Sequence, residues 1–149
     1  MRIRISSSFA LFCACFLISC SSVRPSAHII INNDSNKDVP LQVSITDAGS
    51  HTVSRTISQT LRPGIQEIAA GKFAKGLYNV AVETDKGIVS ISKPVSLDAD
   101  RWIIINYTST DSMSIAKKYG YVDTNFLKKI NGKYTGIDLF SENRRPPSL

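Results

Sequence analysis

Short runs of β-forming residues recur about every ten residues between positions 27 and 140, and clusters of turn residues separate them. Residues 41–46 alternate apolar and polar side chains, which indicates a strand with one buried face. The expected strands cover residues 28–32, 41–46, 52–57, 65–69, 76–84, 88–97, 101–107 and 137–140, and residues 113–116 are expected to pair back on the strand before them. This spacing predicts a mainly β fold, an antiparallel β-sandwich of about seven strands.

Residues 28–32 form a short β-branched run, which predicts a strand that is buried on both faces, and residues 101–107 predict a second, strongly apolar strand. Their sequences, HIIINNDS from His28 and WIIINYTS from Trp102, resemble one another. The similarity fits a duplicated half-domain, and it also fits two independent apolar strands that each end in an asparagine turn. Pro94 lacks a backbone N–H, so it places its strand at a sheet edge or at a bulge.

The last part of the chain changes character. Residues 123–130 carry Phe126, Leu127 and Ile130 at helical spacing, with Asp123 placed to cap the start, and they predict a short C-terminal helix. Residues 141–149 contain two arginines and two prolines, and we expect a flexible tail there.

The N-terminus has a basic head, Met1 to Arg4, followed by ten apolar residues at positions 9–18. A basic head before a short apolar run is typical of a secretory signal peptide. Ten residues span roughly 15 Å as a helix, whereas a bilayer core needs about 20 residues. The run is therefore expected to direct export and not to remain as a membrane span.

The apolar run ends in Leu17-Ile18-Ser19-Cys20, which resembles the lipobox of bacterial lipoproteins. The resemblance implies that the Cys20 thiol receives a diacylglyceryl group, that cleavage falls between Ser19 and Cys20, and that the new amino group is acylated. Ser21 differs from the aspartate that marks inner-membrane retention in enterobacterial lipoproteins. In a Gram-negative cell this implies a cell-envelope protein anchored in the outer membrane.

Two other interpretations of the N-terminus stay open. The run is also compatible with an ordinary signal peptide that is cut nearby, with Cys20 incidental. A buried N-terminal helix of a cytosolic protein is the weaker alternative, because the run has no polar face to present to solvent.

These features divide the chain into a signal peptide at 1–19, an acylated N-terminus and linker at 20–26, a β-sandwich at 27–140 and a tail at 141–149. Cys13 and Cys15 leave with the signal, so the exported domain has no disulfide and depends on its apolar core. The loss of Arg2 and Arg4 leaves 16 basic and 12 acidic residues, a net charge of +4. This mild charge on an exported chain argues against nucleic acid as a partner.

Residues 76–107 carry a tyrosine hairpin pattern, with Tyr78, Val80 and Val82 on one strand face and Gly87 in the turn. The pattern resembles that of small transthyretin-like and PEGA-type sandwich modules. It implies an Ig-like or transthyretin-like sandwich, and no activity is carried over from it.

The residue patterns of catalytic and metal sites are missing from the sequence. His28 and His51 have no histidine or cysteine partner at ligand spacing, so no metal and no cofactor is expected. Asp98 and Asp100 form one Asp-x-Asp pair before Trp102, which we interpret as an exposed turn.

Two weaker candidates for function lie near the C-terminus. Tyr119, Tyr121 and Tyr134 stand near basic residues, and if exposed they can stack on sugars or contact a partner protein. Asp111-Ser112-Met113 resembles the O-glycosylation sequon of Bacteroidetes, which makes Ser112 a candidate glycosylation site.

The sequence thus predicts a membrane-anchored lipoprotein that is not an enzyme and whose β-sandwich serves for binding or structural support in the cell envelope. Its expected partners are the membrane, through the lipid anchor, and an envelope protein or glycan. The alternatives are a small exported enzyme that acts on a cell-envelope polymer and a non-catalytic subunit of an envelope assembly.

Overall fold

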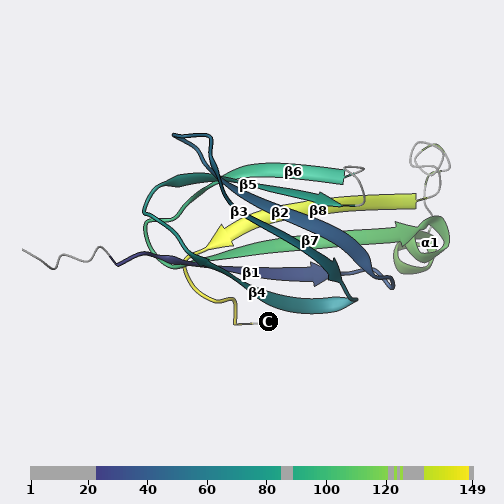
Figure 1. The fold of residues 1–149 in the computed structure, drawn as a ribbon. Helices are drawn as coiled ribbons and strands as arrows, with labels where there is room; N and C mark the ends of the chain where they lie inside the picture. Colours follow the sequence, from purple (N-terminus) through teal and green to yellow (C-terminus); the bar gives the residue numbers. More distant parts are fainter. Residues whose placement is uncertain (1–22, 85–88, 121–122, 124, 126–132, 148–149) are drawn as a thin grey trace, which may run out of the picture.

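The computed structural model describes residues 23–84, 89–120, 123, 125 and 133–147, and its two four-stranded sheets face one another (Figure 1). One sheet, called here the β1 sheet, has the strand order β4 (Gly64–Lys72), β1 (Ser26–Asn33), β7 (Arg101–Asp111) and β8 (Lys133–Glu142). The other, the β2 sheet, has the order β3 (Val53–Leu61), β2 (Val39–Asp47), β5 (Leu77–Thr84) and β6 (Val89–Ser96). The predicted β-sandwich is confirmed.

One core fills the space between the sheets. Side chains alternate along β2, where Leu41, Val43 and Ile45 are buried and Gln42 faces solvent. The other strands also contribute inward residues to the core, and the fully buried ones on β1, β5 and β7 include Ile29, Ile31, Val80, Val82, Ile103 and Ile105. Each such side chain contributes about 1.5–3 kcal/mol when it leaves water. The described domain is therefore held by apolar packing.

The β1–β7 pair is parallel, whereas the other five strand pairs are antiparallel, so the expectation of an all-antiparallel sandwich is wrong at this pair. Its register sets His28 beside Trp102 and continues to Asn33 beside Tyr107. The two similar segments of the sequence are thus neighbours, position for position. Both strands are interior to their sheet, which explains their continuous apolar runs.

The outer face of the β1 sheet is covered as well. Ile30 and Ile104 point away from the inter-sheet core and are adjacent in register, yet only 1% and 4% of their surface is exposed. Arg145 Nη2 lies 3.0 Å from Glu67 Oε2 on β4, although β8 and β4 are opposite edges of this sheet. The segment 143–147 therefore passes from β8 across the outer face (Figure 1). We call it the C-terminal strap.

The helix α1 (Ser112–Tyr119) stands where the sequence suggested a strand over 113–116, and that expectation is wrong. Asp111 caps the helix, since its carboxylate accepts a hydrogen bond from Ser114 N at 2.7 Å. The backbone of Gly120 closes the other end by donating to Ala116 O. Local capping thus outweighs the weak apolar pattern of this segment.

The predicted C-terminal helix, over 123–130, lies almost wholly outside the described residues. Asp123 and Asn125 are described, and Asp123 Oδ1 accepts from Asn125 N at 2.8 Å. Pro94 lies on β6, an edge strand, as predicted. The last strand, β8, runs from Lys133 to Glu142 and extends beyond the expected 137–140 on both sides.

Candidate functional site: a cationic pocket at the end where β1 begins

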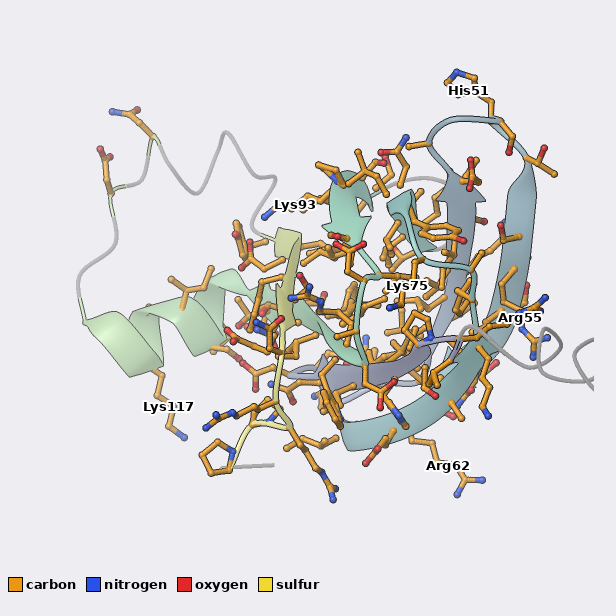
Figure 2. The ribbon with its side chains drawn as sticks, turned by 90° about the vertical axis from the view of Figure 1, so that its left-hand side faces the viewer. His51, Arg55, Arg62, Lys75, Lys93 and Lys117 are labelled. Carbon is orange, nitrogen blue, oxygen red and sulfur yellow. The ribbon has the colours of Figure 1, made fainter. Side chains whose placement is uncertain are left out.

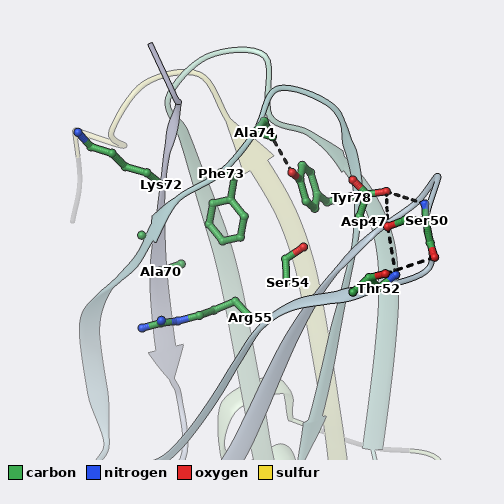
Figure 3. Close-up of a pocket in the computed structure, with 11 residues that line it drawn as sticks. Asp47, Ser50, Thr52, Ser54, Arg55, Ala70, Lys72, Phe73, Ala74 and Tyr78 are labelled. Atoms are coloured by element: carbon green, nitrogen blue, oxygen red, sulfur yellow. Dashed lines mark hydrogen bonds between the residues drawn. The ribbon is translucent and has the colours of Figure 1, made fainter. Parts of the chain in front are cut away.

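The two long sides of the sandwich differ. Strand β6 lies against β8, whereas β3 and β4 leave their shared turn at Arg62 and Pro63 and separate toward the other end. Between the start of β3 and the end of β4 lies a pocket of about 520 Å³ (Figure 3). It is at the end of the sandwich where β1 begins, at the left of Figure 1.

Two aromatic side chains form the inner wall of this pocket. Phe73 and Tyr78 meet edge to face, with ring centroids 5.5 Å apart and planes inclined at 71°. The Tyr78 hydroxyl donates to Ala74 O at 3.0 Å (Figure 3). Burial raises the pKa of this phenol, the nearby Asp47 carboxylate adds to the rise, and the Arg24 charge opposes it. Tyr78 is therefore a neutral wall residue.

The only acidic side chain among the residues lining the pocket is that of Asp47, which is engaged in the turn between β2 and β3. Its Oδ1 accepts hydrogen bonds from Gly49 N at 2.9 Å, Ser50 N at 2.7 Å and Ser50 Oγ at 3.1 Å. The bonds from Ser50, above all, lower the pKa of this carboxyl below 3.8. Asp47 is thus an ionised structural anchor of the turn and is not tuned for proton transfer near neutral pH.

Positive charge dominates the mouth of the pocket. Arg55 and Lys72 line one side of it, opposite the Asp47 turn (Figure 3). Lys75 follows in the connection between β4 and β5, and Figure 2 shows Arg55 and Lys75 at the end of the sandwich that faces the viewer. Arg24 belongs to the same end, because the residue after it, Pro25, accepts a hydrogen bond from Phe73 N at 2.9 Å. Two cations in the pocket lining, with two more at the same end of the sandwich, suit an anionic ligand.

The pocket could not be predicted from the sequence, because its cations come from three separate segments. Arg24 precedes β1, Arg55 lies early in β3, and Lys72 and Lys75 follow 17 or more positions later. Only Lys72 and Lys75 are close to one another in the sequence, and two neighbouring lysines usually lie on a solvated surface. Their convergence depends on the sheet topology.

The structure places the predicted contact residues at the opposite end of the sandwich. Tyr134 is the second residue of β8 and is 43% exposed, and Tyr119 ends α1, while Tyr121 lies outside the described residues. A Cβ at Gly136 would lie 2.9 Å from the Tyr134 hydroxyl, so the ring lies over the glycine of its own strand. The Tyr134 ring thus occupies the space beside Gly136, where a side chain is missing.

The other predicted positions are distributed as follows. Ser112 is the first residue of α1, and the carboxylate before it is the helix cap. Ser19 and Cys20 lie outside the described residues. Asp98 accepts from Ser96 Oγ within the turn, and Asp100 accepts from Ser26 N at the start of β1, at 2.7 Å.

Within the described ranges, no three His, Cys, Asp or Glu side chains come together as metal ligands. Among the same residues, no helix has the length and apolar character needed to cross a bilayer. Comparison with protein-family models, with curated proteins and with solved structures gave no match to this chain.

Proposed function

We propose that the chain is a bacterial lipoprotein, anchored through Cys20, whose β-sandwich serves for binding or structural support at the cell envelope. The observation that carries the proposal is the order of basic head, ten apolar residues and Leu17-Ile18-Ser19-Cys20. A thioether-linked diacylglyceryl group requires a cysteine at this position, and the small Ser19 lets a peptidase close around the scissile bond.

Lipid energetics support a stable anchor. Each buried methylene contributes about 0.8 kcal/mol, and one acyl chain alone holds a protein only marginally. Two or three chains on Cys20 hold it for practical purposes permanently. Strand β1 begins at Ser26, six positions after Cys20, so the linker between them spans at most about 20 Å. The proposed anchor therefore keeps the domain beside the membrane.

Binding is favoured over catalysis by the chemistry of the pocket. A hydrolase needs a free carboxylate or a nucleophile with an adjacent base. Asp47 instead anchors a turn, and the hydroxyl of Ser50 donates to that same carboxylate. Arg55 and Lys72 attract and orient an anion without supplying a base. The pocket therefore supports binding more than the enzyme alternative. Copurification tests the assembly-subunit alternative, because such a subunit brings protein partners with it.

Metabolic labelling with an alkyne fatty acid tests the anchor. We expect labelling and membrane fractionation of the natural chain, and loss of both in Cys20→Ser. Cys15→Ser is the matched control, since it removes a thiol from the same segment and leaves the lipobox unchanged. Equal labelling of Cys20→Ser and the natural chain contradicts the proposal.

A further inference from the structure

We propose that the pocket beside Tyr78 binds the phosphate of an anionic phospholipid headgroup in the membrane to which the chain is anchored. This inference rests on the proposed function, because the anchor decides which end of the sandwich meets the bilayer. Three independent features of that end support it: its distance from Cys20, its charge and its exposed apolar side chains.

The pocket is tied to the linker that leads from the anchor. Phe73 N, in the pocket wall, donates to Pro25 O at 2.9 Å. Pro25 follows Cys20 by five positions, so the chain between them spans at most about 18 Å when fully extended. A lipid on Cys20 thus keeps the pocket within the reach of headgroups.

The charge of the pocket matches a phosphodiester. Arg55 and Lys72 line it, and Lys75 and Arg24 lie at the same end. A guanidinium offers two parallel N–H donors to phosphate oxygens, and an ammonium adds a point charge. Each Lys or Arg near an anionic membrane surface contributes about 1 kcal/mol of attraction.

Apolar side chains at this end are also exposed. Val23 is 82% exposed, Val53 at the start of β3 is 56% exposed and Leu77 at the start of β5 is 53% exposed. The unfavourable free energy of exposing these side chains to water is removed if they enter the boundary between headgroups and acyl chains. Cations together with exposed apolar residues favour a lipid headgroup over a free anion as the ligand.

Thermal unfolding of the full chain, purified from membranes in a neutral detergent, tests the proposal. The added ligands are short-chain phosphatidylglycerol, short-chain phosphatidylcholine and inorganic phosphate, each at the same phosphate concentration. At about ten times the Kd, phosphatidylglycerol is expected to raise Tm by roughly 4 °C, and the other two by less than about 1 °C. The shift falls in high salt, because exposed charges are screened.

Two double variants with the same net charge test whether the rise in Tm comes from the pocket. Arg55→Gln with Lys72→Gln is expected to reduce the Tm shift at least threefold. Arg62→Gln with Lys93→Gln, which changes exposed residues outside the pocket lining, is expected to keep the shift. All four side chains are exposed, so both variants should fold, and far-ultraviolet circular dichroism without lipid checks this.

Three results overturn the proposal: an equal shift with phosphatidylcholine, an equal shift with inorganic phosphate, or equal loss in the two double variants. The first indicates a general lipid effect, the second a site for free phosphate and the third non-specific charge. The mass of the same purified chain reports separately whether Cys20 is acylated. Failure of the anchor and failure of the pocket are therefore distinguishable.

Discussion

Asn33 connects three parts of the β-sandwich through one buried amide. Its Nδ2 donates to Leu61 O at 3.2 Å and to Lys37 O at 3.0 Å, while its Oδ1 accepts from the backbone and hydroxyl of Ser35. Only 2% of Asn33 is exposed. Because buried polar groups are costly without partners, this residue fixes the turn after β1 to the end of β3.

Asn33→Ala is expected to lower the free energy of unfolding by about 2–3 kcal/mol, since it removes the buried hydrogen bond to Leu61 O and the bonds that hold the turn after β1. Urea unfolding measures the change. Asn36→Ala, at an exposed position of the same turn, is the control and should stay within about 0.5 kcal/mol of the natural chain. A loss below about 1 kcal/mol in Asn33→Ala would show that water replaces the amide.

The Asp47 carboxyl gives the β2–β3 turn a dependence on pH. Its folded pKa is lowered below 3.8 by hydrogen bonds from Ser50, so its stabilising effect is present above pH 3.8. That effect is lost as the pH falls through the lowered folded pKa. Titration of the Asp47 side-chain carbon by NMR should give a midpoint below 3.8, and a midpoint at or above 3.8 contradicts this interpretation.

The same turn shows what residue patterns do not reveal. Gly49 is the residue in this turn best suited to a positive φ, yet it is His51 that adopts φ 55°. The backbone N–H of His51 donates to Asp47 O at 2.9 Å, which sets the shape of the turn. The sequence predicts the turn, but the position of the residue with positive φ follows from this hydrogen bond, which joins residues four positions apart.

At the scale of elements, most strands could be predicted because β-branched runs and turn residues alternate regularly. The orientation of β7 beside β1 could not, because apolar periodicity carries no information on strand direction. The continuous burial of residues 29–31 and 103–105, within the apolar runs 28–32 and 101–107, is typical of parallel neighbours, and the apolar runs were the available signal. Helix α1 was missed because its start depends on one cap, Asp111.

Asp111→Ala is expected to destabilise the domain by about 1 kcal/mol, since the backbone of Ser114 loses its acceptor at the start of α1. Asp111→Ser, which keeps an acceptor, is expected to recover most of the loss. Urea unfolding of both variants measures the effect. Equal destabilisation by serine and alanine would show that the cap does not stabilise α1.

At the scale of the whole molecule, the C-terminal strap gives the β1 sheet a second covered face. His28 and Trp102 stack there with centroids 5.0 Å apart and planes at 12°, next to Ile30 and Ile104. The Arg145–Glu67 ion pair is about half exposed and contributes little by itself. We expect the strap to stabilise the sheet mainly by keeping water from these apolar side chains.

Removal of residues 143–149 is therefore expected to cost about 2 kcal/mol, as Ile30 and Ile104 become accessible to water. Arg145→Ala, which removes only the exposed ion pair, should cost less than about 0.5 kcal/mol. Trp102 is the single tryptophan, so its fluorescence reports the change directly. Equal acrylamide quenching of Trp102 before and after truncation would show that the strap does not cover it.

The proposed role of the candidate pocket depends on the N-terminus, because only a lipid anchor on Cys20 would hold the pocket beside a membrane. The sequence predicts the anchor from contiguous residues, whereas the pocket required the sheet topology that joins Arg24, Arg55 and Lys72. A motif of contiguous residues can be recognised in the sequence, but a site formed by residues from distant segments cannot. The anchor is for this reason the more direct claim to test.

The most direct measurement is mass spectrometry of the N-terminal peptide of the chain isolated from bacterial membranes. Our account predicts a peptide that begins at Cys20 and carries a diacylglyceryl group on its sulfur, with an amide-linked acyl chain when the amino group is modified. A peptide that begins at another residue, or one that contains an unmodified Cys20, would contradict it.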